Sequence, residues 1–326
     1  MGGFASFLGR RLIKAVFILL AIVAINFLLV RAAPGDPAMV MAGEAGAADE
    51  QYVRQLRERF GLDRPLYEQL AIYVAGVATG DLGHSYRQQR PVWDLIAERL
   101  PPTLILTGCA FVLALVAGIL LGILAAMNVG RWSDSAITVL ALLSYATPIY
   151  WVGLMMILLF SVQLGWLPAF GYETIGAGHQ GWARAADIAE HLIMPAVTLG
   201  LFYMAVYARL TRASILEVRD MDFVKTARAK GLSETRIVFK HVLRNAILPV
   251  ITFAGIQAGH LIGGSILIET VFAWPGIGRL AFDAVVQRDY QVLLGIFFIS
   301  SVMVVAFNLI TDLIYTFVDP RIEVGK

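Results

Sequence analysis

Long runs of apolar residues dominate the chain and are separated by polar stretches. Six runs reach the roughly 20 residues that a helix needs to cross a bilayer. They lie near Leu12–Val30, Thr103–Met127, Ala136–Leu164, Leu192–Leu210, Ala246–Ile268 and Val292–Val318. Because the runs are continuous rather than alternating, helices are favoured over the strands of a membrane barrel. The pattern predicts an all-α integral membrane protein with six transmembrane helices.

The first run follows Arg10, Arg11 and Lys14 and precedes the sequence "VRAA", as a secretory signal peptide would. It is longer than the apolar core of a typical signal peptide. We therefore interpret it as an uncleaved membrane helix.

Lysine and arginine in short loops predict orientation, because cytoplasmic loops carry an excess of both. The N-terminus, the turn at 128–135 and the loop at 211–245 are the basic ones. The 211–245 loop holds Arg212, Arg219, Lys225, Arg228, Lys230, Arg236, Lys240 and Arg244. The short loops on the other side hold only Arg184, Arg279 and Arg288. Both termini and the 211–245 loop are therefore expected in the cytoplasm.

This orientation divides the chain into four parts. They are a first transmembrane helix at 1–31, an extracytoplasmic region at 32–98, a core of five transmembrane helices at 99–318, and a cytoplasmic tail at 319–326. Within the outer region, Asp49–Phe60 is a charged helix candidate ended by Gly61. The stretch "RPVWDLIAERLPPT" predicts an interfacial helix leading to Pro101 and Pro102, which suit the start of the second span.

Composition agrees with a membrane protein. The chain of 326 residues is 58% hydrophobic and 15% charged, whereas soluble domains carry about 25% charged residues. The single cysteine, Cys109, lies in an apolar run, so no disulfide framework can form within the chain. We interpret it as a small apolar residue.

Small residues and one proline predict how the helices pack. Gly255, Gly259 and Gly263 recur at four-residue spacing, which lets helix backbones approach closely. Gly118 and Gly122 repeat this spacing in the second run. The third run is interrupted by "LLSYATPIYW", where Pro148 predicts a kink and Ser144, Tyr145 and Thr147 can satisfy nearby backbone groups.

Sequence signatures of catalysis are missing. The chain contains no G-x-x-x-x-G-K-[ST], H-E-x-x-H or C-x-x-C motif, and its five histidines lack metal-ligand spacing. The basic loop lacks the aromatic platforms of a nucleic-acid site. We expect no catalytic residue, no metal and no cofactor in this chain, and no nucleic-acid partner. Six helices without a catalytic centre suggest transport rather than chemistry.

Polar residues inside spans are costly and are therefore candidates for function. They are Asn26, Gln163, Gln257, His260, Asn308 and Asp312. Gln257, His260 and Asn308, together with Tyr145 beside the predicted kink, are our candidates for lining a path across the membrane. For His260 a hydrogen-bonded packing role is the alternative, and Asp312 can reach the interface instead.

The most distinctive stretch is "KTARAKGLSETRIVFKHVLRN", from Lys225 to Asn245. Glu217–Lys230 can continue the fourth helix into the cytoplasm, and Gly231 then turns the chain. Ser233 suits an N-cap, with Glu234 in the first turn of the next helix. That helix offers Ile237, Val238 and Val242 on one side. The loop is expected to form a helix, a glycine turn and a helix, which either meets anionic lipid or docks on a cytoplasmic protein.

The continuation "TARAKGLSETRIVFKHVLRNAILP" resembles the cytoplasmic signature loop of ABC-importer permeases in their dipeptide, oligopeptide and nickel branch. Against the general signature, aligned on Gly231, only Ala227 and Leu243 match, whereas the branch form "ARAKGL…KH…LRNA.LP" fits closely. Further stretches that resemble the branch are "PGDP", "GDLGHSY", "RLPPTL", "GGSILIETVFAWPGIGRL", "RDY" and "DPR". They cover nearly the whole chain in the expected order.

The resemblance implies a type I ABC-importer permease fold and a set of partners. These are a second homologous permease subunit, two cytoplasmic ATPase subunits that bind ATP and Mg²⁺, and an extracytoplasmic substrate-binding protein. The signature loop would contact an ATPase. Its residues here are Ala227, Arg228, Ala229, Lys230, Gly231, Leu232, Ser233 and Glu234.

The substrate implied is a di- or oligopeptide, and nickel chelates, glutathione and opine-like compounds stay open. From another class, an ion-coupled carrier acting alone would need intramembrane acidic relays, and Asp312 is the one acidic residue placed firmly inside a predicted span. A membrane scaffold or assembly factor is a third alternative.

Overall fold

The structure is a computed structural model that describes residues 2–32, 35, 38, 39, 42 and 49–318. The side chains of residues 2–8, 258–264 and 312–318 lie outside the description. So do the tail at 319–326 with its "DPR" motif, the "PGDP" motif apart from Gly35, and the side chains of His260 and Asp312.

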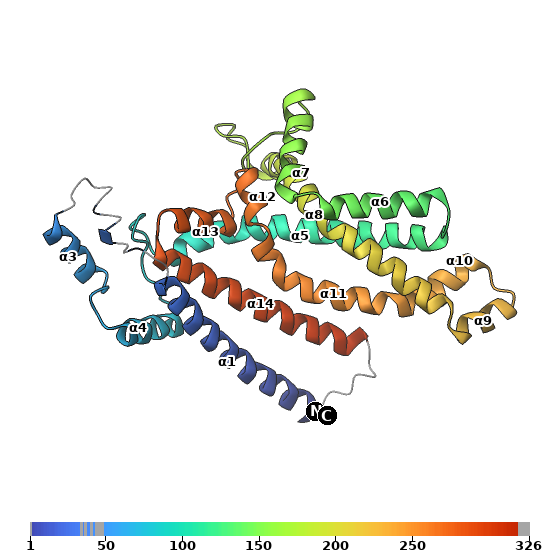
Figure 1. The fold of residues 1–326 in the computed structure, drawn as a ribbon, viewed down its shortest axis with the longest axis horizontal. Helices are drawn as coiled ribbons and strands as arrows, with labels where there is room; N and C mark the ends of the chain where they lie inside the picture. Colours follow the sequence, from blue (N-terminus) through green and yellow to red (C-terminus); the bar gives the residue numbers. More distant parts are fainter. Residues whose placement is uncertain (1, 33–34, 36–37, 40–41, 43–48, 319–326) are drawn as a thin grey trace. The chain divides into compact units, whose positions relative to one another are not determined.

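The regular elements of the described residues are helices (Figure 1). In chain order they are α1 (Gly2–Ala32), α3 (Glu50–Arg59), α4 (Leu66–Thr79), α5 (Val92–Met127), α6 (Trp132–Ala146), α7 (Ile149–Met156), the π-helix η1 (Ile157–Gln163), α8 (Gly181–Arg219), α9 (Asp222–Ala229), α10 (Glu234–Ile237), the π-helix η2 (Val238–Val242), α11 (Leu243–Gly264), α12 (Ile266–Val271), α13 (Ile277–Val286) and α14 (Tyr290–Val318). One isolated β-bridge joins His84 and Pro91. The predicted all-α class is confirmed.

Five of the described helical stretches are long and apolar enough to cross a membrane. A sixth is added if α6 and the α7–η1 pair count as one span, although they are bent by 103° at Thr147 and Pro148. The predicted kink at Pro148 is confirmed. Thr147 donates its hydroxyl to the Leu143 carbonyl at 2.7 Å, which satisfies one backbone group at the break.

The outer region contains the predicted charged helix but not the predicted start at the proline pair. Helix α3 is capped by Asp49, whose carboxylate accepts from the Gln51 N–H at 3.2 Å, and Gly61 follows at φ +63°. The expectation that a new helix begins at Pro101 and Pro102 is wrong, because α5 runs unbroken through both. Proline removes helix hydrogen bonds, but tertiary contacts hold α5 here: the indole of Trp274 donates to the Pro102 carbonyl at 2.9 Å.

By internal contacts the chain divides into two compact units. The first comprises the described residues up to 101 together with 276–306. Its core joins α1, α4, α13 and the start of α14, and includes Phe27 stacked on Tyr73 at 5.9 Å between ring centroids. The Tyr73 hydroxyl donates to the Leu294 carbonyl at 3.0 Å, which ties α4 to α14.

Two of the motifs noted in the sequence meet in this first unit. The buried carboxylate of Asp289, from "RDY", accepts the hydroxyl of Ser85 and the backbone N–H groups of Tyr86 and Arg87 at 3.3 and 3.2 Å. The Gln291 side chain donates to the Leu82 carbonyl at 3.0 Å. The "GDLGHSY" segment is thereby fixed to the start of α14.

The second unit comprises residues 102–275 and 307–318. Its core joins α5, α7, α8, α11 and α12 around Trp274, Tyr207 and Phe272, which are at most 1% exposed. A Cβ added at Gly118 would lie 2.9 Å from the Met204 carbonyl oxygen, and one at Gly122 would lie 2.7 Å from that of Ala208. The prediction that this glycine spacing permits close helix approach is confirmed for α5 against α8.

Candidate functional site

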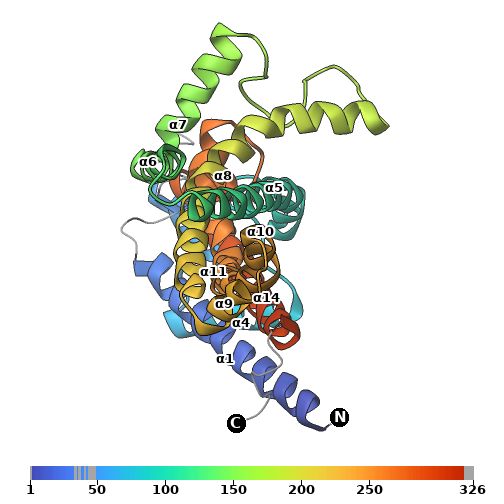
Figure 2. The same ribbon diagram turned by 90° about the vertical axis from the view of Figure 1, so that its right-hand side faces the viewer.

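The basic loop forms a compact projection at the C-terminal end of α8. Figures 1 and 2 show α9 and α10 side by side there, and in Figure 1 they lie at the opposite end of α8 from α7 and α12. The expectation that the fourth helix continues to Lys230 is wrong, because α8 ends at Arg219 and α9 begins at Asp222. The break lets α9 fold back, so that Val224 and Ala227 become buried.

Gly231 makes the turn between the two short helices. Its φ is +75°, in the left-handed region that glycine adopts without steric cost. The Gly231 N–H donates to the Arg228 carbonyl at 2.9 Å. Ser233 holds the N-cap position of α10, and its carbonyl accepts from Ile237 N–H at 2.9 Å, but its side chain makes no capping bond. The predicted helix, glycine turn and helix is confirmed, and the cap acts through its backbone alone.

A hydrophobic cluster fastens this projection to the membrane helices. Val224 and Ala227 of α9 and Ile237 of α10 are 0–6% exposed. They pack with residues of α5, α8, η2 and α11, namely Ile123, Ala126, Ile215, Val218, Val242 and Ala246. The apolar side predicted for the helix after Gly231 therefore faces inward. It anchors the loop and is not available for docking.

Ion pairs between charged side chains span the Gly231 turn on its outer side. The Nε of Arg228 lies 2.7 Å from Oε1 of Glu234, and its Nη2 lies 3.3 Å from Oε2. This hydrogen bond raises the pKa of Arg228 above its usual value. Arg219 lies 3.6 Å from the same carboxylate and donates to the Ala126 carbonyl at 3.1 Å. Glu234 thus links the turn to the ends of α8 and α5.

Six of the eight predicted loop residues remain at the surface. Ala227 is buried and Leu232 is half-buried against the cluster. The exposed six are Arg228, Ala229, Lys230, Gly231, Ser233 and Glu234. Sequence reasoning missed Met221 and Phe223, which are 43% and 41% exposed beside them. The available signal was a pair of large apolar side chains in a charged loop, one directly before α9 and one in its first turn.

The neighbouring turn at 128–135 is fixed to α8 by an ion pair that the sequence did not reveal. Arg212 donates from Nε and Nη2 to Asp134 at 2.7 and 2.8 Å. The same carboxylate accepts from the Gly130 N–H at 3.2 Å. Much of the Arg212 charge is therefore used within the chain.

The path candidates fall into different surroundings. Tyr145 stacks on Phe202 at 5.4 Å between centroids and lies under the guanidinium of Arg209 at 5.4 Å. Phe202 in turn contacts Tyr203 edge-on, at 5.3 Å between ring centroids, so a row of aromatic rings on α8 begins at Tyr145. Gln257 lies on α11 and is half-buried. Asn308 is exposed on α14, and His260 lies outside the described side chains.

A buried carboxylate in the "GGSILIETVF" motif was not among the candidates. Glu269 is 0% exposed and accepts the hydroxyls of Thr103 and Ser265 at 2.8 and 2.9 Å. The bond from Thr103 joins α12 to α5, whereas Ser265 directly precedes α12. Thr103 lies far from Glu269 in the sequence, so no local pattern could indicate their contact.

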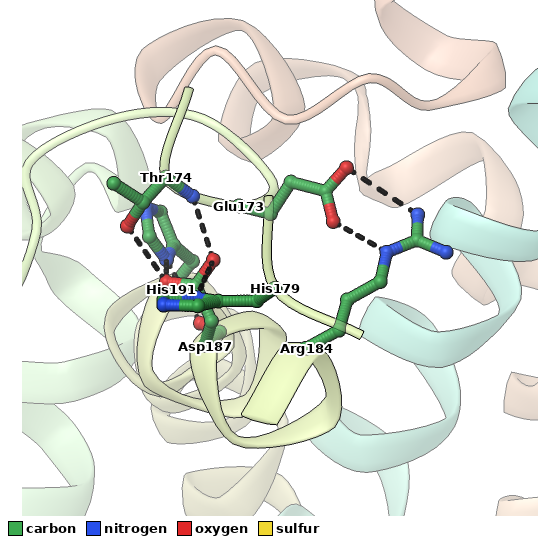
Figure 3. Close-up of polar contacts among 6 residues, drawn as sticks. All are labelled: Glu173, Thr174, His179, Arg184, Asp187 and His191. Atoms are coloured by element: carbon green, nitrogen blue, oxygen red, sulfur yellow. Dashed lines mark hydrogen bonds and ion pairs between the residues drawn. The ribbon is translucent and has the colours of Figure 1, made fainter. Parts of the chain in front are cut away.

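A polar cluster lies at the N-terminal end of α8 (Figure 3). The Asp187 carboxylate accepts from the Thr174 N–H and hydroxyl, both at 2.7 Å, and lies 3.7 Å from His179. His191 Nδ1 lies 2.8 Å from the Asp187 carbonyl oxygen. Arg184 pairs with Glu173 at 2.6 Å. The cluster fixes the 164–180 loop to α8, and no group of three or more metal-ligating side chains occurs within the described residues.

Comparison with known proteins decides the family. Residues 118–324 match the model of the family described as "Binding-protein-dependent transport system inner membrane component". Residues 4–107 match the model of the corresponding N-terminal membrane component. The chain belongs to this family. It is therefore an inner membrane component of a transport system, as the resemblance of its motifs implied.

Relatives match over almost the whole chain. The di/tripeptide transport system permease protein DppB of Pseudomonas aeruginosa is 40% identical over 334 residues, covering 98% of both chains. The dipeptide transport system permease protein DppB of Escherichia coli is 40% identical over 340 residues, covering 98% of this chain and 99% of its own. The glutathione transport system permease protein GsiC of Escherichia coli is 42% identical over 314 residues, covering 96% and 97%.

Solved structures support the fold. The inward-facing methionine ABC transporter MetNI aligns with a TM-score of 0.54 at 19% identity, over 69% of this chain and 96% of its own. An amino acid ABC transporter crystallised with histidines aligns at 0.51 and 18% identity, over 68% and 92%. The predicted ABC-importer permease fold is confirmed.

Proposed function

We propose that this chain is a permease subunit of an ATP-driven peptide importer and forms half of its translocation path. Relatives whose names specify di- and tripeptides match it from end to end. A glutathione permease matches at similar identity, so glutathione is the alternative substrate best supported; nickel chelates and opine-like compounds rest on the branch resemblance alone.

The observation that carries the mechanism is the anchored turn around Gly231. Buried side chains on its inner face pack against α5, α8 and α11. Its outer face exposes Phe223, Arg228 and Lys230. A rigid projection of this kind can transmit a push from a partner to the membrane helices. The proposed partner is a cytoplasmic ATPase, which in this proposal binds ATP and Mg²⁺ and carries out the hydrolysis.

The complete transporter in this proposal contains two homologous permease subunits, two ATPase subunits and an extracytoplasmic binding protein that delivers the peptide. The Gly231 turn and both termini lie on the cytoplasmic side, as the basic loops favour. Tyr145 and Gln257 are proposed to line the path from α6 and α11, with Asn308 on α14 and His260 as further candidates.

The test is purification of the chain together with the products of adjoining genes, followed by reconstitution in liposomes. We expect an ATPase to copurify, and we expect radiolabelled dipeptide to accumulate only when ATP is supplied on the ATPase side. Uptake by this chain alone, driven by an ion gradient without ATP, would establish a carrier instead. Glutathione uptake without dipeptide uptake would change the substrate and leave the ATP-driven mechanism intact.

A further inference from the structure

A cavity in the first unit lies where two candidate membrane spans end. Its volume is about 590 Å³, and it is lined by Arg31, Gly35, Arg54, Arg57, Glu58, Leu62, Asp63 and Tyr290. Arg31 belongs to the last turn of α1, whose candidate span ends at Ala32, and Tyr290 begins the candidate span of α14. Whichever way these helices cross the bilayer, their ends place the cavity at the depth of the phospholipid headgroups.

The lining is rich in groups that bind oxyanions. Among the described residues it contributes three guanidinium groups and two carboxylates. Planar guanidinium groups donate paired hydrogen bonds that match phosphate and carboxylate oxygens. The hydroxyl of Tyr290 donates to the Gly35 carbonyl at 3.3 Å, so it helps to hold one wall in place.

Arg31 is positioned before any ligand arrives. Its guanidinium carbon lies 5.6 Å from the centroid of the Phe27 ring, which holds the cation against an aromatic face. Its Nε is buried and has no hydrogen-bond partner in the part of the chain that the structure describes. Because an unpaired buried donor is costly, Arg31 gains from an acceptor that enters the cavity.

Exposed aromatic side chains in the same unit also fit a membrane interface. Helix α4, which contacts α1, begins with Leu66 and Tyr67, 55% and 71% exposed, and Trp93, the second residue of α5, is 53% exposed. Tyrosine and tryptophan concentrate at headgroup depth in membrane proteins. The surroundings of the cavity therefore suit contact with lipid.

We propose that this cavity binds the phosphate of an anionic phospholipid headgroup, with Arg31, Arg54 and Arg57 as its cationic ligands. The lining residues belong to the first unit, whereas Gly231 belongs to the second. The occupant of the cavity is a lipid rather than a soluble anion, because two membrane spans end at it and bilayer phosphates lie at that depth.

The test is native mass spectrometry of the assembled transporter released from nanodiscs of phosphatidylglycerol and phosphatidylcholine in equal amounts. We expect preferential retention of phosphatidylglycerol. Arg31→Gln and Arg54→Gln should each lower that retention by about tenfold, the effect of one lost charged hydrogen bond. Arg64→Gln is the matched control, since this nearby arginine does not line the cavity.

Equal retention of the two lipids, or equal loss in the Arg64→Gln control, would overturn the proposal. Displacement of phosphatidylglycerol by millimolar inorganic phosphate would overturn the lipid assignment in favour of a free anion. Because Arg31 also packs on Phe27, the exposed Arg54 provides the second variant. An unchanged melting temperature with reduced retention in Arg54→Gln supports a direct contact, and unchanged retention there counts against it.

Discussion

Arg228 and Glu234 face each other across the Gly231 turn, with the guanidinium Nε 2.7 Å from a carboxylate oxygen. The two side chains are 39% and 54% exposed, so the pair contributes little to stability, typically about 0–1 kcal/mol. Its position suggests another role, since it fixes the angle between α9 and α10. That angle determines how the exposed face of the turn meets a partner.

Breaking this pair should reduce coupling more than stability. For Glu234→Gln we expect ATP-dependent uptake to fall by roughly 2- to 30-fold, corresponding to a coupling change of about 0.5–2 kcal/mol. The melting temperature should change little. The double variant Arg228→Glu with Glu234→Arg should recover part of the uptake. If the loss of uptake in the double variant equals the combined losses of the two single variants, the pair does not act through the contact between its two side chains.

Substitution of Gly231 should be costly through the backbone alone. A Cβ at this position would meet no atom within 4 Å, but φ is +75°. We expect Gly231→Ala to destabilise the turn by about 1–2 kcal/mol, the cost of a left-handed conformation for an ordinary residue. Gly231→Asn should be milder, because asparagine tolerates this region. Hydrogen exchange of the 221–237 amides is the measurement, and equal protection in the Ala and Asn variants would contradict the expectation.

Gly122 should tolerate no side chain. A Cβ there would lie 2.7 Å from the Ala208 carbonyl oxygen and 2.5 Å from the Thr211 Cβ, so α5 and α8 would have to separate. We expect Gly122→Ala to cost about 1–3 kcal/mol, seen as a lower melting temperature in detergent. Gly108→Ala on the same helix is the control, because nothing lies within 4 Å of its added Cβ. Equal melting temperatures would show that the two helices are less closely packed.

Phe223 should matter for ATPase binding and not for folding. It is 41% exposed beside the charged turn. Truncating an aromatic side chain at the centre of a protein interface often costs about 2 kcal/mol or more of binding free energy. We expect Phe223→Ala to weaken ATPase association by at least about tenfold, measured by biolayer interferometry in nanodiscs. Phe239→Ala, 54% exposed after the turn on η2, is the matched control. Similar losses from both variants would indicate a general surface effect rather than a contact at Phe223.

The sequence was sufficient where a residue or run determines its own conformation. The bilayer demands continuous apolar helices, so the spans could be located; Pro148 marked the break in the third, and Gly231 the turn. The sequence was insufficient where contacts between residues far apart along the chain determine the structure. Trp274 supports α5 through the proline pair, and the buried Glu269 is held by a hydroxyl from α5. The functional loop was recognised by its motif, but which of its side chains face outward depended on the fold beneath it.

The central claim, that the Gly231 turn contacts an ATPase, is tested most directly by site-specific cross-linking in the assembled transporter. A photoreactive amino acid placed at Lys230, and separately at exposed Trp182 at the far end of α8, provides probe and control. The account predicts a cross-link to the ATPase from position 230 and none from position 182. An ATPase cross-link from position 182 with none from position 230 would contradict it.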